Sequence, residues 1–263
     1  MSFVKSAIRR VLPRNLVSVY TDFRQSTLAR RNQRMTTEQV FTSIYSNNRW
    51  GGASGTFCSG DGSHETSIVA PYVAKVIAEL DRVGAKAMTV VDLGCGDYSV
   101  GRQLSPSCGR YIGVDIVKHL VAHNQATFGS ANVSFQHANI VEDTLPDGDI
   151  CFVRQVLQHL SNDQIIAVLP KLSKFRWCFI TEHHPSPGRL QLPNKDKPHG
   201  DNIRISGGSG VFLDEPPFSI PAQAYRLLLE VPGILPIDGT DPGVIRTFLL
   251  NGGHSMGAGP QRS

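Results

Sequence analysis

The chain has 263 residues, of which 40% are hydrophobic and 18% are charged, and its formal net charge is +4. This length and composition predict a soluble globular protein built around one substantial core. No apolar run approaches the ~18 residues that a membrane-spanning helix needs. The five cysteines form no C-x-x-C pair, which predicts free thiols in a reducing cytoplasm.

The positive charge is concentrated in residues 1–35, a basic amphipathic extension with eight basic residues and one acid. The rest of the chain keeps 18 of the 26 basic and 21 of the 22 acidic residues. An acidic body argues against nucleic acid as a partner. The extension allows three interpretations: a helix that caps the domain, a peripheral contact with anionic lipid at the inner face of the membrane, or a mitochondrial presequence. Nothing in the sequence indicates an oligomeric state.

A buried strand, a glycine turn and the start of a helix are predicted between Met88 and Leu104. Asp92 lies at the end of the strand, and Gly94 and Gly96 follow it. The two glycines can adopt positive φ and let a ligand approach the backbone. The first free N–H groups of the helix would face that ligand.

Two kinds of cofactor suit this turn. The dinucleotide fingerprint G-x-G-x-x-G needs a third glycine where the chain has Ser99. Asp92 would also repel a pyrophosphate, whereas a cofactor with a cationic sulfonium and an amino-acid tail tolerates a carboxylate. The run VVDLGCGD resembles the first motif of the class I S-adenosylmethionine (SAM)-dependent methyltransferases. The resemblance implies SAM as cofactor, bound at Asp92, Gly94 and Gly96.

The resemblance also implies an α/β fold with a doubly wound, Rossmann-like, mostly parallel seven-stranded sheet. The last strand would be antiparallel, and a helical cap and a lid loop would precede the sheet. We expect the methyltransferase domain to span residues 36–250, with a substrate-side insertion at 185–221. Residues 251–263 are predicted to be a flexible tail.

The second and third predicted strands supply further nucleotide contacts. Asp115 and Ile116 end the second strand, where a carboxylate can accept both ribose hydroxyls. In the class I methyltransferases, the turn after the third strand, here residues 133–136, holds the adenine. Asn139 matches as an amide that can pair with the adenine amino group. Ile140 could stack on the ring.

The fourth predicted strand, residues 148–153, leads into the run VRQVLQHLS. This run resembles a recurrent "VLxHL" motif of the methyltransferases. Arg154, Gln155, Gln158 and His159 follow the strand, at the edge where ligands bind. Gln155 is a predicted cofactor contact. His159 is a catalytic candidate, and the alternative is a histidine packed between a helix and the lid.

The fifth predicted strand, residues 177–181, is followed directly by Glu182, His183 and His184. Methyl transfer to a hydroxyl needs a base, and histidine suits neutral pH. His183 and His184 are therefore catalytic candidates. Neighbouring side chains of a strand point to opposite faces, so we expect one of the two at most to face the methyl group.

A divalent metal ion is an open alternative for this cluster. Glu182, the histidines, Asp196 and Asp201 supply hard ligands. Their spacing is not diagnostic, so no metal ligand is assigned. Ordinary loop contacts are the third interpretation.

A loop rich in glycine and serine runs from Trp50 to Thr66. It is either a linker or a lid that folds over a bound cofactor. The run IYSNNRWGG…SGDGSHET resembles the N-terminal signature of small bacterial methyltransferases that often accompany genes for surface polysaccharides and other glycans. The resemblance implies that Trp50 and Ser59 contact the cofactor.

These observations together predict a cytoplasmic SAM-dependent methyltransferase. The resemblance favours O-methylation of a sugar hydroxyl on a glycan or glycolipid. The alternatives are O-methylation of a small natural product or lipid, and a non-catalytic module that only binds the cofactor.

Overall fold

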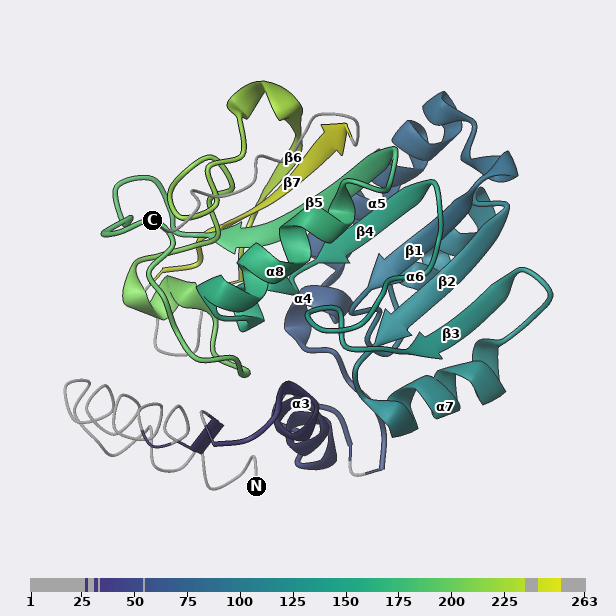
Figure 1. The fold of residues 1–263 in the computed structure, drawn as a ribbon, viewed down its shortest axis with the longest axis horizontal. Helices are drawn as coiled ribbons and strands as arrows, with labels where there is room; N and C mark the ends of the chain where they lie inside the picture. The colour runs from purple at the N-terminus through teal and green to yellow at the C-terminus, as the bar shows by residue number, and fades with distance from the viewer. Residues whose placement is uncertain (1–26, 28–30, 33, 54, 235–240, 252–263) are drawn as a thin grey trace.

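The computed structural model describes residues 27, 31–32, 34–53, 55–234 and 241–251. Its centre is a seven-stranded sheet in the order β3-β2-β1-β4-β5-β7-β6 (Figure 1). The strands are β1 (Thr89–Leu93), β2 (Arg110–Asp115), β3 (Val133–His137), β4 (Ile150–Arg154), β5 (Trp177–His184), β6 (Tyr225–Pro232) and β7 (Val244–Asn251). Strands β1 to β5 pair in parallel, and β7 is antiparallel to both β5 and β6. The predicted fold class is confirmed.

The helices flank this sheet or cover one of its edges. They are α3 (Thr37–Ser46), α4 (Asp61–His64), α5 (Thr66–Val83), α6 (Gly101–Leu104), α7 (Lys118–Phe128) and α8 (Asn162–Leu172). Short 3-10 turns are η1 (Ala85–Ala87), η2 (Ser105–Ser107), η3 (Leu157–His159), η4 (Arg204–Gly207) and η5 (Ala222–Ala224). None of the described helices is long and apolar enough to cross a membrane.

Local sequence signals set several helix ends. Thr36 and Ser161 begin α3 and α8 with capping boxes, in which the cap hydroxyl and a glutamine three residues later exchange hydrogen bonds with the backbone. Gly84 ends α5 in the left-handed conformation, as predicted from its position after an apolar helical repeat.

Side chains that alternate along the strands enter two cores. On one face, α8 packs against Val91 and Leu93 of β1. On the other face, side chains of α5, α6 and α7 pack with Val90. Figure 1 shows α8 in front of the sheet and α5 behind it. Strand residues therefore reach the same site only where their side chains point to the same face of the sheet or where they lie at the ends of the strands.

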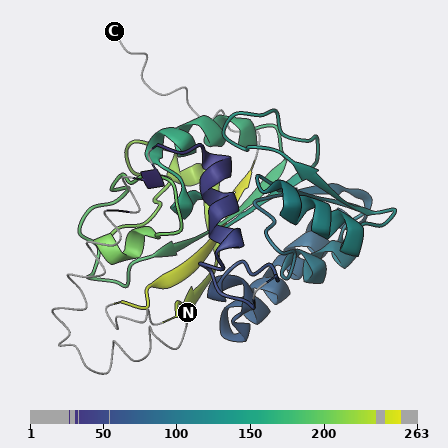
Figure 2. The same ribbon diagram turned by 90° about the horizontal axis from the view of Figure 1, so that it is seen from below.

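The carboxyl ends of the parallel strands meet at one edge of the sheet, and α3 lies over that edge (Figures 1 and 2). The loop after α3 continues over the same edge. We call residues 50–53 and 55–64 the lid. Side chains of α3 and of the lid therefore line the space at the strand ends.

The fifth strand is longer than predicted. It continues to His184, because its last three residues pair with residues 244–246 of β7. Most of the extension 1–35 and residues 252–263 of the tail lie outside the described residues, so the predictions made for them stay predictions.

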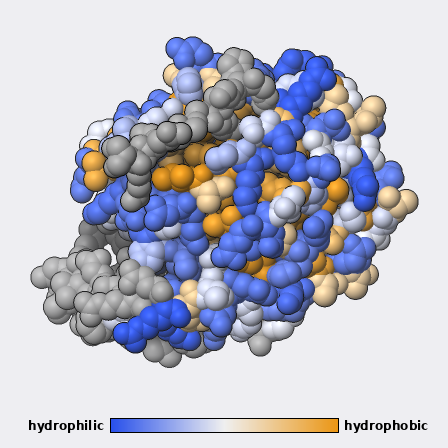
Figure 3. Space-filling view, in the orientation of Figure 1, coloured by the Kyte–Doolittle hydropathy of each residue, from blue (hydrophilic) through white to orange (hydrophobic). Residues whose placement is uncertain are grey.

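The face of the molecule in front of the sheet carries apolar residues among many hydrophilic ones (Figure 3). In the described part of the chain, the large apolar side chains that are exposed are Ile166, Leu190, Leu192 and Leu227.

Candidate active site

A cavity of about 490 Å³ lies at the carboxyl ends of the strands, bounded by α3 and the lid. Most of the predicted site residues line it: Trp50, Ser59, Gly94, Gly96, Asp115, Ile116, Asn139, Ile140, Gln155, His159 and His183. The exceptions are Asp92 and His184. Residues from six separate stretches of the sequence thus share one space, which the parallel strand ends bring together.

The glycine turn is held close to other parts of the protein. Gly94 and Gly96 have φ of 73° and 55°. A Cβ atom on Gly94 would lie 2.5 Å from a methyl carbon of Val156, and one on Gly96 would lie 2.2 Å from Ser59 Oγ. The sequence predicts close approach by a ligand, but the atoms that approach most closely belong to the lid and to the turn after β4.

Asp115 is fixed at the end of β2 by backbone N–H groups. Its Oδ2 accepts from Gly96 N–H at 3.1 Å, and its Oδ1 accepts from Val117 N–H at 3.0 Å. Burial raises the pKa of Asp115, and these N–H groups oppose the rise. Because a carboxylate has about four acceptor positions, both oxygens can still accept hydroxyl groups from a ligand in the cavity.

The turn after β3 offers one directed polar group between apolar walls. Asn139 Oδ1 accepts from Val141 N–H at 3.0 Å, which fixes the amide so that its NH₂ group is the donor left for a ligand. Ile116 and Ile140 line the same part of the cavity. A flat heteroaromatic ring with an acceptor nitrogen fits these surroundings.

Asp92 lies beneath the turn instead of in the main cavity. Tyr111 donates a short hydrogen bond from its hydroxyl to Asp92 Oδ2. Burial raises the pKa of Asp92 to about 6. Asp92 lines a neighbouring cavity of about 30 Å³, which shares Gly94 and Arg154 with the main cavity. Direct contact of Asp92 with the cofactor stays a prediction.

Arg154, at the end of β4, lines both cavities. Its Nη2 donates to the Gly62 carbonyl at 2.6 Å, and its guanidinium lies over the Tyr72 ring at 4.8 Å. Its Nε is buried and has no hydrogen-bond partner. A buried guanidinium with a free donor suits an anionic group of a ligand.

The lid is fastened to the glycine turn by Asp97, which sequence reasoning missed. Ser59 N–H donates to Asp97 Oδ2 at 2.8 Å, and Asp97 N–H donates to Ser59 Oγ at 2.8 Å. The Tyr45 hydroxyl is 3.0 Å from the same Oγ. Burial opposes ionisation, but hydrogen bonds from Ser99, Ser59 and His64 hold the pKa of Asp97 below its usual range. The signal available in the sequence was the acid that directly follows Gly-Cys-Gly.

Aromatic contacts hold the first part of the lid against α3 and η3. The Trp50 ring lies 5.2 Å from both the Tyr45 and the His159 ring centroids, and 6.0 Å from Phe41. His159 Nδ1 donates to the Gly200 carbonyl at 3.0 Å. Burial lowers the pKa of His159 to about 3, so its imidazole is neutral at pH 7 with the lone pair on Nε2. His159 packs against the lid, as one interpretation predicts. It also lines the cavity, so its catalytic role stays a prediction.

Glu182 orients the turn that carries His159. Its carboxylate accepts from Leu157 N–H at 2.9 Å and from Gln158 N–H at 3.0 Å. Burial raises the pKa of Glu182 to about 8, against the effect of these donors. The residue acts on the site through the backbone of η3.

The two neighbouring histidines of β5 point to opposite faces, as predicted. His183 lines the cavity, and its Nε2 donates to the Pro242 carbonyl at 2.7 Å, which leaves the lone pair on Nδ1. Burial lowers the pKa of His183. His184 instead packs between the rings of Phe212 and Phe248 and donates to the Val211 carbonyl at 2.8 Å. His184 is therefore not placed to act as the base.

The hard metal ligands suggested near β5 are engaged elsewhere. Asp201 forms an ion pair with Arg49, and Asp196 accepts from Asn162 N–H at 2.8 Å. Glu182 accepts from the backbone of η3. Within the described ranges, these acids do not form a group that could share a metal ion.

The comparisons with known proteins agree with the predicted class. Residues 90–175 match the family described as a methyltransferase domain. The match lies within the predicted domain of residues 36–250, whose bounds stay a prediction. No curated protein sequence matches the chain.

Many solved structures match the fold, two methyltransferases among them. Human N-acetylserotonin methyltransferase in complex with SAM is 13% identical with a TM-score of 0.50, and the match covers 82% of this chain and 60% of that protein. Magnesium protoporphyrin IX methyltransferase from Synechocystis PCC 6803 with bound SAH is 14% identical with a TM-score of 0.51, over 82% of this chain and 99% of that one. At these identities the likeness concerns the fold.

Proposed function

We propose that the protein is a SAM-dependent O-methyltransferase. One observation carries the proposal: a single cavity joins the nucleotide-type groups of the strand ends to two neutral histidines. The methyltransferase domain match over residues 90–175 supports the reaction class.

The donor side of the cavity fits the parts of SAM. Asp115 would accept the ribose hydroxyls, and the Asn139 amide would donate to the adenine between Ile116 and Ile140. The Arg154 guanidinium, which lines the cavity, suits the carboxylate of the amino-acid tail. Asp92 would act at a distance, through the field it adds beside Arg154.

SAM supplies an electrophilic methyl group: a bond forms between the acceptor oxygen and the methyl carbon as the bond from that carbon to sulfur breaks. The acceptor hydroxyl loses its proton in the same reaction, and a base of this chain would take it. The lone pairs are on His159 Nε2 and His183 Nδ1, because each ring donates its other nitrogen to a carbonyl. His159 Nε2 receives only a long contact of 3.5 Å from Gln158 Nε2. The remaining contribution of the protein is alignment of the two reactants.

We propose that the acceptor is a sugar hydroxyl of a glycan or glycolipid. This proposal depends on the resemblance of the lid sequence to that of the small bacterial methyltransferases that often accompany genes for glycans. A second candidate, a small natural product or lipid, is favoured by the apolar lining near His183. That lining consists of Ile68, Ile203, Ile205, Ile234 and Ile245. A glycolipid would satisfy both observations, because it combines a sugar hydroxyl with apolar surface.

Calorimetric titration with S-adenosylhomocysteine tests the donor site. We expect binding by the wild type and at least tenfold weaker binding by Asp115→Asn, which loses one charged acceptor. Asp147→Asn, an acid that is fully exposed, is the matched control and should bind as the wild type does. Binding of NAD in place of S-adenosylhomocysteine would overturn the proposal.

Transfer of a labelled methyl group to glycolipids and to small phenols then separates the acceptors. Donor binding without transfer to any hydroxyl acceptor would favour the non-catalytic module.

A further inference from the structure

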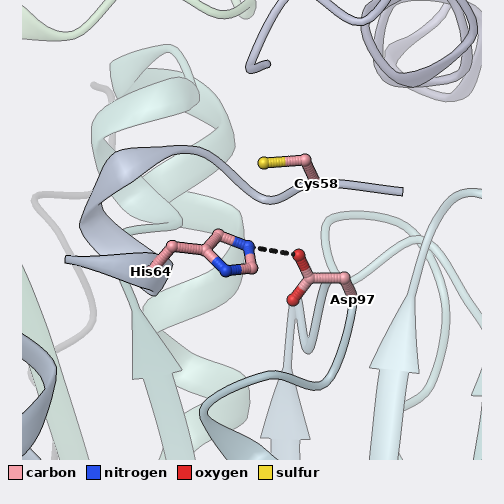
Figure 4. A group of neighbouring side chains, drawn as sticks. All are labelled: Cys58, His64 and Asp97. Carbon is pink, nitrogen blue, oxygen red and sulfur yellow. Dashed lines mark hydrogen bonds and ion pairs between the residues drawn. The ribbon is translucent and has the colours of Figure 1, made fainter. Parts of the chain in front are cut away.

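A second chemical cluster lies on the lid, outside the cavity. Cys58 and His64 belong to the lid, and Asp97 belongs to the glycine turn (Figure 4). One ligand atom from each of the three residues lies within 4.8 Å of the other two. None of the three lines the main cavity. The position of these three residues is therefore not explained by methyl transfer.

We propose that Cys58, His64 and Asp97 bind a zinc ion that fastens the lid to the glycine turn. Thiolate sulfur, imidazole nitrogen and carboxylate oxygen are each donors that zinc accepts in proteins. Magnesium and calcium prefer oxygen donors alone. Three protein ligands leave the fourth tetrahedral position to water.

The present geometry needs one adjustment before it can accept the ion. His64 Nε2 lies 2.7 Å from Asp97 Oδ2. Two zinc ligands at ordinary bond lengths are roughly 3.4 Å apart, so a rotation of the imidazole would make room for the ion. The His64 side chain is 45% exposed, which allows this movement and gives the ion access from solvent. Cys58 makes a long contact of 3.7 Å between its Sγ and the Trp50 carbonyl, which it can give up at little cost.

The ion would join Asp97 to two lid residues, Cys58 and His64, that lie 39 and 33 residues before it in the chain. Ser59, between the two lid ligands, already exchanges two hydrogen bonds with Asp97. Coordination would add bonds on either side of this pair, and the Cys58 thiol would release its proton to solvent. The ion would thus hold the lid closed without touching the contents of the cavity.

Metal binding by the full chain tests the proposal directly. The protein is freed of metal with a chelator and titrated with Zn²⁺, and in parallel with Co²⁺, whose thiolate charge-transfer absorption reports a sulfur ligand. We expect one ion per chain and the sulfur signal in the wild type. Cys58→Ser should abolish the sulfur signal, and Cys58→Ser and His64→Ala should each weaken Zn²⁺ binding at least tenfold. Cys108→Ser and His123→Ala are matched controls and should leave both readouts unchanged.

Lid closure is measured in the same samples from Trp50, with Trp177→Phe removing the other tryptophan. Zn²⁺ should reduce acrylamide quenching of Trp50 in the protein with all three ligands and leave it unchanged in Cys58→Ser. The proposal would be overturned if the wild type bound no stoichiometric Zn²⁺. It would also be overturned if Cys58→Ser and His64→Ala bound Zn²⁺ as tightly as the wild type does. Neither readout depends on methyl transfer.

Discussion

Gly96 should be the position of the turn least able to accept a side chain. Its φ of 55° is unfavourable for any residue with a Cβ atom, and that atom would lie 2.2 Å from Ser59 Oγ. Rotation of the serine side chain would move Oγ but not Ser59 Cβ, which would still be 3.0 Å away. Gly96→Ala must therefore displace the lid backbone at Ser59.

The expected cost has two parts. An alanine in the left-handed region costs about 1–2 kcal/mol. Displacing Ser59 also breaks the hydrogen bonds of its Oγ with Asp97 N–H and the Tyr45 hydroxyl, each worth about 1 kcal/mol. Gly96→Ala should thus lose about 3–4 kcal/mol of unfolding free energy.

Gly84→Ala is the matched control, because Gly84 has φ of 75° and no atom within 4 Å of the added Cβ. It should lose about 1–2 kcal/mol, the conformational part alone. Urea unfolding measures both free energies, and calorimetry with S-adenosylhomocysteine measures the affinity, which should fall for Gly96→Ala and stay unchanged for Gly84→Ala. Equal losses of stability in the two variants would refute the argument that the lid is packed on this glycine.

Three further outcomes are expected. Burial holds His159 neutral, with a pKa of about 3, and lowers the pKa of His183, so neither histidine as the base should give kcat/KM an acid limb at pH 6.5. Asp92, with a pKa of about 6, titrates in the same range, so only a fall by half at pH 6.5 that persists in Asp92→Asn would contradict either histidine as the base. Replacing the acting base by alanine should lower kcat by about 10²–10⁴-fold, so His159→Ala and His183→Ala, assayed with the same acceptor, identify it. His184 has a pKa lowered to about 4, so its stabilising contribution is present above pH 6.5 and is lost as the pH falls toward 4. Between pH 7 and pH 5 this titration should lower the free energy of unfolding of the wild type by about 2 kcal/mol. His184→Phe lacks the titrating group, so its free energy of unfolding, measured with urea, should fall by about 2 kcal/mol less than that of the wild type over the same interval.

The sequence predicted the fold and the edge of the sheet at which the site lies. The apolar runs and glycines located the strands, and the residues at the strand ends follow from parallel topology, in which carboxyl ends share one edge. Period-two alternation also predicted that His183 and His184 would separate. It could not say which one faces the cavity, because that depends on the packing of α8 against one face of β5.

Other parts of the site depend on contacts between distant segments. Glu182 orients η3 through two N–H groups about 25 residues away in the chain, and Asp97 holds a serine 38 residues before it. No local pattern marks a carboxylate as an acceptor for a particular backbone segment. Asp92 shows the same limit: its position in the motif is that of a ligand contact, and no local pattern indicates that its Oδ2 also accepts a hydrogen bond from the Tyr111 hydroxyl on the neighbouring strand.

The lid and the glycine turn form one hydrogen-bonded unit, and this links ligand binding to lid closure. Asp115, which faces the cavity, accepts from Gly96 N–H, and the next residue, Asp97, holds Ser59 of the lid. A ligand that engages Asp115 therefore acts on the turn that positions the lid. If a ligand of the cavity binds the closed lid more tightly than the open one, reciprocity requires that whatever fastens the lid also tighten binding of that ligand. The lid ligands of the proposed zinc site lie on either side of Ser59, so an ion there would strengthen donor binding from outside the cavity.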